Sequence, residues 1–166
     1  MRRGEGMNSI PPEGEPITAA GLLALEAELD ELETTGRRAI AERILAAREL
    51  GDLSENADYH IAKEDQAHLE TRIARLRQRR SNALIVESDA EGSAFAFGTT
   101  AEILDEGSGK MYTWTLVGST EADLGQGKLS AQSPVGQALL GCGAGESVKV
   151  QTPRGSRSYR VHRLVP

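Results

Sequence analysis

The sequence predicts an α+β protein in two parts: an N-terminal antiparallel coiled-coil hairpin of helices, and a C-terminal domain that mixes strands with a helix. Residues 17–87 contain no proline and show the apolar spacing typical of helices. Residues 92–166 hold most of the glycine and show short alternating apolar patterns. We therefore place the hairpin domain at residues 16–88 and the second domain at 92–166, with a boundary near 89–93.

Composition limits the functions that we expect. The chain of 166 residues has a formal net charge of −6, which argues against tight binding of nucleic acid over the whole surface. Its one cysteine, Cys142, cannot form an intrachain disulfide, and this suits a reducing cytoplasm. No apolar run reaches the roughly 20 residues of a membrane span, and the N-terminus lacks the apolar segment of a signal peptide. We expect a cytoplasmic monomer with no membrane partner and a disordered N-terminal segment over residues 1–15.

The first half of the hairpin is predicted to run from an N-cap at Thr18 to a C-cap at Gly51. Thr-Thr-Gly at 34–36 weakens this helix, and we expect a kink there. Apolar residues recur along it at helical spacing: Leu22, Leu25, Leu29, Leu32, Ile40, Ile44 and Ala47.

A second helix is predicted by an apolar stripe, and the short connection makes the two helices antiparallel. The stripe consists of Ile61, Leu69, Ile73, Leu76 and Ala83. If the chain bends at 52–53, the numbers of facing residues add up to about 105. The facing pairs are then Leu32 with Ile73, Leu29 with Leu76, Leu22 with Ala83, Ile44 with Ile61, and Gly36 with Leu69. This register puts Asp52 and Glu55 at the tip of the hairpin.

Two groups of basic residues lie along the hairpin. One group consists of Arg72, Arg75, Arg77, Arg79 and Arg80, and it faces the acids Glu26, Glu28, Asp30, Glu31 and Glu33. We favour ion pairs across the helix interface for this group, with a nucleic-acid patch as the alternative. The other group consists of Arg37, Arg38, Arg43, Arg48 and Lys63. It has fewer acidic neighbours, so it contains the better candidates for contact with phosphates.

The second half reads as short strands around one helix. Residues 101–104 and 111–118 are predicted to form a strand hairpin. The segment SPVGQALLG, residues 133–141, is predicted to be a short helix that Ser133 caps, with Pro134 in its first turn and Gly141 at its end. Further strands are predicted where apolar residues alternate on either side of a turn at 152–155: Val148 and Val150 before it, Tyr159 and Val161 after it.

From spacing alone, Asp52 and Glu55 form a capping box for the second helix, in which the acids satisfy backbone amides at its start. The alternative is that they act as chemical groups at the tip. His60, Glu64 and His68 recur every four residues, but no H-E-x-x-H motif is present, so we expect no metal site there.

Two segments resemble signatures of a known family. The stretch AARELGDLSENADYHIAKEDQ, residues 46–66, resembles the signature of the Gre family of bacterial transcript-cleavage factors. SPVGQALLG and GESVKVQTPRG, residues 145–155, resemble the second motif of that family. The resemblance covers about residues 17–166 and implies a coiled-coil hairpin followed by a domain of FKBP-like fold.

The resemblance implies a function without an active site of its own. Such proteins bind RNA polymerase at the rim of its secondary channel and insert the hairpin. They stimulate cleavage by the polymerase of backtracked RNA, whose 3′ end has been extruded. Asp52 and Glu55 would be the catalytic tip carboxylates and would bind a second Mg²⁺ together with the polymerase. The isolated protein would hold no cofactor and would not be an enzyme.

The resemblance also implies roles for other residues. Tip support is expected from Gly51, Leu53, Ser54, Asn56 and Tyr59, RNA contact from Arg48 and Lys63, and polymerase docking from Ser133, Pro134, Leu139, Leu140 and Gly141. Two positions depart from the family pattern: Leu50 stands where many members have histidine, and Ser54 where many have a basic residue.

The sequence supports three other functions less well. A Gre-like inhibitor would occupy the channel without promoting cleavage, but the intact GDLSEN sequence at residues 51–56 favours cleavage. A prolyl isomerase is disfavoured because residues 92–166 contain few aromatic side chains from which to build its pocket. A purely structural coiled coil would not explain the second domain.

Overall fold

The computed structural model describes residues 14–87 and 92–166. Contacts within the chain divide it into two units: Ala20–Ala83 on one side, and the residues up to Ala19 together with Leu84–Pro166 on the other. Most of the expected disordered segment at 1–15, and part of the expected boundary at 89–93, lie outside the described residues. No helix of the described residues is long and apolar enough to cross a membrane.

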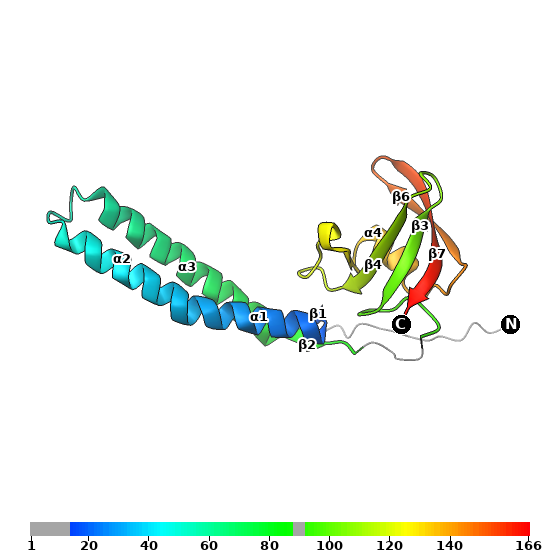
Figure 1. Cartoon of the computed structure of the whole chain (residues 1–166), viewed down its shortest axis with the longest axis horizontal. Helices are drawn as coiled ribbons and strands as arrows, with labels where there is room; N and C mark the ends of the chain where they lie inside the picture. Colours follow the sequence, from blue (N-terminus) through cyan, green and yellow to red (C-terminus); the bar gives the residue numbers. More distant parts are fainter. Residues whose placement is uncertain (1–13, 88–91) are drawn as a thin grey trace. The chain divides into compact units, whose positions relative to one another are not determined.

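The first unit is the predicted antiparallel helical hairpin (Figure 1). One arm consists of α1 (Ala19–Glu31), a π-helical segment (Leu32–Gly36) and α2 (Arg37–Glu49), and the other arm is α3 (Ala57–Asn82). The buried residues between the arms are Leu25, Leu29, Ile44, Ala47, Ala62, Ile73 and Leu76. All of them are aliphatic, so the shape and spacing of these apolar side chains favour one register of the two arms.

The register agrees with the predicted one at Gly36, where an added Cβ would lie 3.4 Å from Leu69 Cδ1. The predicted pairing of Ile44 with Ile61 is wrong, because Ile61 is 52% exposed and Ala62 is buried instead. Ala62 lies seven residues before Leu69 and so repeats its position on the helix, whereas Ile61 lies eight residues before it.

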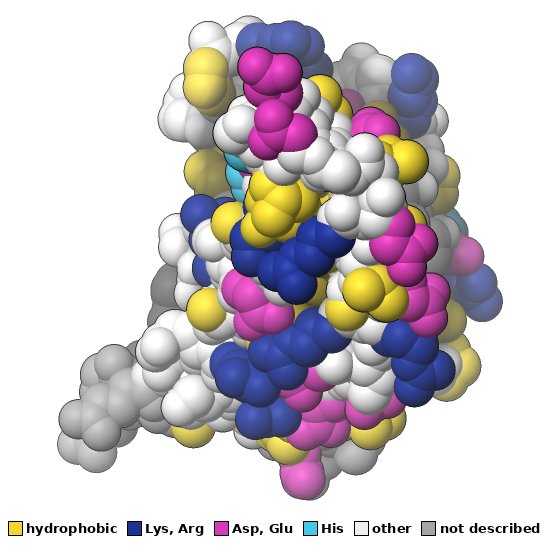
Figure 2. Space-filling model, turned by 90° about the vertical axis from the view of Figure 1, so that its left-hand side faces the viewer, with side chains coloured by type: hydrophobic (Ala, Val, Ile, Leu, Met, Phe, Trp, Pro, Cys, Tyr) yellow, Lys and Arg dark blue, Asp and Glu magenta, His cyan; other side chains and the backbone are white. Residues whose placement is uncertain are grey.

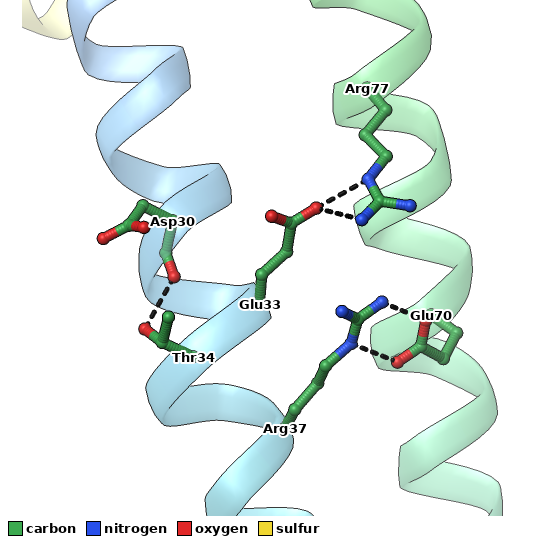
Figure 3. A network of polar contacts seen from close by, with 6 residues as sticks. All are labelled: Asp30, Glu33, Thr34, Arg37, Glu70 and Arg77. Carbon is green, nitrogen blue, oxygen red and sulfur yellow. Dashed lines mark hydrogen bonds and ion pairs between the residues drawn. The ribbon is translucent and has the colours of Figure 1, made fainter.

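The kink predicted at 34–36 falls within a π-helical segment, Leu32–Gly36, in the first arm (Figure 3). There the Thr34 hydroxyl donates to the Asp30 carbonyl oxygen at 2.7 Å. A hydroxyl bonded four residues back competes with the helical ladder, and wide turns of this kind are a known source of helix irregularity.

Ion pairs join the two arms, as the sequence predicts for part of the first arginine group. Arg72 pairs with Glu28. Arg77 pairs with Glu33, as Figure 3 shows. The prediction is wrong for Arg75, Arg79 and Arg80, which form no ion pair with a described residue. Arg79 lies seven residues after Arg72 and so repeats its position on the helix, yet its buried Nε has no hydrogen-bond partner among the described residues.

Two residues of the second basic group are also paired, against expectation. Arg37 Nε lies 2.9 Å from Glu70 Oε1, and Arg43 Nη1 lies 2.8 Å from Asp65 Oδ2. Hydrogen bonding to Arg37 lowers the pKa of the Glu70 carboxyl. Arg37 and Arg43 therefore stabilise the contact between the two arms, and they are poorer candidates for phosphate contact than the sequence indicates.

The second unit is built on a five-stranded sheet in the order β5-β4-β3-β7-β6. Its elements are β3 (Thr100–Asp105), β4 (Met111–Val117), β5 (Lys128–Ser130), β6 (Ser147–Thr152), β7 (Gly155–Val165) and the helix α4 (Pro134–Leu139). The predicted β3–β4 hairpin, the strands around 152–155 and the helix are confirmed. The parallel strand β5 was not predicted. Phe95, Ile103, Leu116, Leu139 and Val161 form the fully buried centre of this domain.

A small two-stranded sheet was also not predicted. It pairs β1 (Glu15–Ile17) with β2 (Ala83–Ile85). Ala83, expected at the end of the second helix, has extended backbone angles, and α3 ends at Asn82. Ala83 continues the apolar spacing of the second helix, but its pairing in the β1–β2 sheet gives it an extended conformation instead.

The cross-arm ion pairs lead to a stability prediction. Replacing both Arg72 and Arg77 with Gln should lower the free energy of unfolding by about 0.2–1 kcal/mol per pair, because each pair is exposed and screened by water. The loss should shrink at high salt. The matched control replaces Arg75 and Arg80 with Gln, which removes the same charge without breaking an ion pair. Thermal denaturation at low and high salt measures both, and equal losses in the two double variants would contradict the assignment.

The acidic tip of the hairpin as candidate functional site

The candidate site is the loop of residues 50–56 that joins α2 to α3, which we call the tip. The chain leaves α2 through two tight turns, in which Leu50 N donates to the Ala47 carbonyl and Gly51 N to the Arg48 carbonyl. Gly51 has a φ of +99°, a conformation that favours glycine and agrees with the predicted C-cap. The reversal is thus a defined structure that places the following acidic residues at the far end of the helices.

Asp52 is held by Ser54. The Ser54 amide and hydroxyl both donate to Asp52 Oδ1, at 3.1 and 2.8 Å. These bonds, the hydroxyl's foremost, lower the pKa of the Asp52 carboxyl. The carboxylate is therefore charged at neutral pH and its direction is restrained, while no hydrogen bond to a described residue occupies Oδ2.

The predicted capping box is wrong, because Asn56 caps α3 instead. Asn56 Oδ1 accepts from the Tyr59 amide at 3.1 Å, and Asn56 Nδ2 donates to the Ala47 carbonyl at 2.6 Å. One side chain thus caps the second arm and ties it to the end of the first. Glu55 is exposed and forms no hydrogen bond or ion pair with a described residue. Neither acid is needed to start the helix.

Two basic residues lie beside the tip without a carboxylate partner among the described residues. Arg48 lies over the Tyr59 ring, 5.9 Å from its centroid, a cation–π arrangement. Lys63 Nζ donates to Gln66 Oε1 at 2.8 Å. Both side chains keep their full positive charge available, unlike Arg37 and Arg43.

His60, near the start of α3, contacts the tip, and the sequence did not indicate this part in the site. Its Nε2 lies 3.3 Å from the Ser54 carbonyl oxygen, which links the start of α3 to the loop. The periodic set of His60, Glu64 and His68 forms no metal cluster. Across residues 14–87 and 92–166, no three His, Cys, Asp or Glu side chains are grouped to hold an ion.

The surface of the tip is mixed in character. Figure 2 looks onto this end of the hairpin and shows acidic, basic and hydrophobic side chains lying next to one another. Leu50 and Leu53 are 71% and 42% exposed. Two carboxylates in such a setting can supply oxygen ligands to a hard cation such as Mg²⁺, but they are too few to bind it firmly without ligands from elsewhere.

In the predicted docking segment around α4, some residues cap the helix or lie in the core, and others are exposed. Ser133 Oγ accepts from the Gly136 amide at 3.0 Å and caps α4, as predicted. Leu139 is fully buried, and Leu140 packs against the same core, so the expectation that Leu139 contacts a partner is wrong. Pro134 and Gly141 are exposed, so a docking surface here would consist of the two ends of the segment.

Comparison with known proteins identifies relatives of both halves. The family model described as "Transcription elongation factor, N-terminal" matches residues 15–85, and "Transcription elongation factor, GreA/GreB, C-term" matches residues 90–164. Transcription elongation factor GreA of Rhodospirillum rubrum is 44% identical over 147 residues, which cover 88% of this chain and 94% of the relative. Transcription elongation factor GreA of Bradyrhizobium sp. is 41% identical over 150 residues, with coverage of 90% and 95%.

Solved structures are similar as well. GreA factor homolog 1 of Thermus thermophilus is 29% identical, with a TM-score of 0.40, over 92% of this chain and 99% of that chain. The factor GreA/GreB of Nitrosomonas europaea is 21% identical, with a TM-score of 0.40, over 92% and 98%.

The double role of Asn56 leads to a prediction at the tip. Asn56→Ala should lower the free energy of unfolding by about 1 kcal/mol, because the cap of α3 is lost. It should also speed hydrogen exchange of the Tyr59 amide, whose acceptor is removed. Glu55→Ala is the matched control and should change neither quantity. A comparable loss of stability in Glu55→Ala would restore the capping-box interpretation.

Proposed function

We propose a function that starts from one premise: the chain belongs to the GreA/GreB family of transcription elongation factors and is of the GreA type. It is a transcription elongation factor that acts on RNA polymerase, and any cleavage that it stimulates is carried out by the polymerase. The remaining question is which of its residues act, and how.

The hairpin enters the polymerase channel into which backtracked RNA is extruded, and it brings Asp52 and Glu55 to the active centre. The observation that carries this proposal is that the two acids are exposed while Asn56 performs the capping for which they would otherwise be needed. Their side chains are thus available to a partner, and the loop that presents them is held by Ser54 and Asn56.

The donor set at the tip fits a shared Mg²⁺, because it consists of two exposed carboxylates. Asp52 and Glu55 would hold the ion together with ligands from the polymerase. A bound Mg²⁺ would activate the attacking water and stabilise the charge that develops at the phosphate. Ser54 fixes the direction of Asp52, so the tip is preorganised for this task before it reaches the polymerase.

Two further surfaces complete the proposal. Arg48 and Lys63 lie within about three helical turns of the tip and face the RNA phosphates, since neither is neutralised by an acid among the described residues. The C-terminal domain docks to the polymerase through the exposed ends of the α4 segment, around Pro134 and Gly141. The alternative of a channel-occupying inhibitor is not favoured, because an inhibitor needs no free carboxylates at its tip.

Removing the carboxylates tests the proposal. Asp52→Asn and Glu55→Gln should each abolish stimulated cleavage, because an amide is a poor ligand for Mg²⁺ and carries no charge. Binding should persist, since neither acid is part of the docking surface. The measurement follows labelled RNA in a backtracked complex of the cognate polymerase, with competition against wild-type protein to report binding. Normal cleavage by either variant would show that its carboxylate has no ligand role.

The basic residues beside the tip give a separate prediction. Replacing Arg48 and Lys63 with Gln should slow cleavage and flatten its dependence on salt, because fewer counterions are released when RNA is bound. The control replaces Arg75 and Arg80 with Gln, an equal loss of exposed, unpaired charge on α3 but farther from the tip. Cleavage rates at two salt concentrations report the difference. The assignment fails if the control variant shows the same loss.

A further inference from the structure

His60, in the first turn of α3, turns its side chain back over the tip. Its Nε2 lies 3.3 Å from the Ser54 carbonyl oxygen, in the loop. A carbonyl oxygen can only accept, so the ring nitrogen carries the proton and donates the hydrogen bond. The backbone amide of His60 donates to the Asn56 carbonyl at 3.2 Å, the ordinary bond of a helix start. The backbone of His60 thus belongs to α3, while its ring holds the loop.

The imidazole ring is itself restrained by its neighbour. The Tyr59 ring stands edge-on to it, with the two centroids 5.7 Å apart and the ring planes at 65°. Edge-to-face contact is a preferred arrangement of aromatic rings, and it favours one orientation of the imidazole. The donor that reaches Ser54 is therefore carried by a ring whose own direction is limited.

Ser54 is the residue through which this contact acts on both acids. Its amide and hydroxyl donate to Asp52 Oδ1, at 3.1 and 2.8 Å. Its carbonyl belongs to the peptide group that leads into Glu55. Because a peptide group is planar and stiff, a hydrogen bond to that carbonyl also limits the direction in which Glu55 leaves the loop. His60 therefore acts on Asp52 through the whole of Ser54, and on Glu55 through the peptide between them.

The loop has little else to hold its shape. Residues 50–55 are all exposed, so burial of apolar side chains does not fix them. A segment with few buried apolar contacts opens at a small cost in free energy and samples several conformations. The conformation of this loop then depends on its hydrogen bonds, and the bond from His60 joins its middle to α3.

The proposed chemistry makes the directions of the two carboxylates important. Mg²⁺ demands near-ideal octahedral geometry, with ligand oxygens about 2.0–2.1 Å from the ion. A misplacement of about 1 Å at a reacting centre is enough to cost about a hundredfold in rate. Glu55 is the more sensitive of the two acids, because its side chain forms no hydrogen bond or ion pair with a described residue. Its backbone alone determines where the carboxylate starts from.

We propose that His60 is a positioning residue for transcript cleavage. Its ring holds the Ser54 carbonyl and so keeps Asp52 and Glu55 in the directions that a shared Mg²⁺ requires. This inference rests on the proposed function. His60 contacts neither RNA nor the reacting atoms in this account, and it acts through Ser54.

The kinetic test separates positioning from docking. His60→Phe keeps an aromatic ring and removes the donor. It should lower the cleavage rate at saturating factor by about tenfold, and it should raise the Mg²⁺ concentration needed for half-maximal cleavage. The factor concentration for half-maximal rate should stay within about twofold of wild type, because the change removes no contact with the polymerase. An unchanged maximal rate, or a loss confined to the half-saturating factor concentration, would overturn the proposal.

A rescue and a matched control accompany that variant. His60→Gln restores a side-chain N–H donor and should retain most of the rate. The control is His68→Phe, which removes an exposed histidine of the same helix that lies 3.7 Å from Glu64 and away from the tip. It should cleave as the wild type does. Equal losses in His60→Phe and His68→Phe, or no recovery in His60→Gln, would contradict the role of the ring donor.

A second readout needs no polymerase. In ¹⁵N relaxation measurements on the full chain, the order parameters of the Ser54 and Glu55 amides should fall in His60→Phe and recover in His60→Gln. The Tyr59 amide, which Asn56 holds, is the internal reference and should keep its value. Unchanged order parameters at Ser54 and Glu55 would overturn the role of His60. A wild-type protein that fails to stimulate cleavage would instead contradict the proposed function, while the relaxation data would still decide whether His60 holds the tip.

Discussion

The two hydrogen bonds of the Asn56 side chain are the interaction on which the tip depends. Its oxygen caps α3 through the Tyr59 amide, and its nitrogen binds the Ala47 carbonyl at the end of α2. Because Asn56 provides the cap, Asp52 and Glu55 are not needed to start α3, and our proposal assigns them to a metal site that the polymerase completes.

Throughout the described residues, some side chains make contacts within the protein, while others of the same type remain exposed. Along the hairpin, Arg37, Arg72 and Arg77 pair with acids of the opposite arm, while Arg48 and Lys63 do not. In the C-terminal domain, Leu139 lies in the core while Pro134 stays exposed. Residues of one chemical type thus separate into those that stabilise the protein and those that stay exposed, and it is among the exposed ones that we propose the contacts with polymerase and RNA.

Sequence patterns predicted the long-range features that follow from periodicity. The hairpin, its bend and the pairing of Gly36 with Leu69 come from apolar spacing, and β3, β4 and α4 come from alternation and capping residues. The misses arise where spacing carries no information. The alanine side chain of Ala62 gives a weaker apolar signal than its neighbour Ile61, so the heptad position was assigned to the wrong one of the two. Strands β1 and β5 are only three residues long, too short for an alternating pattern to be recognised. The sequence also offers two equally plausible N-caps for α3, Asn56 and the capping box that begins at Asp52.

The central claim is that the tip carboxylates contribute to a metal site that the polymerase alone fills weakly. The most direct measurement is the cleavage rate of a backtracked complex as a function of Mg²⁺ concentration, with no factor, with wild-type protein and with Glu55→Gln. The account predicts that wild-type protein lowers the Mg²⁺ concentration needed for half-maximal cleavage and that Glu55→Gln does not. The same Mg²⁺ dependence in all three reactions, with wild-type protein raising only the maximal rate, would contradict it.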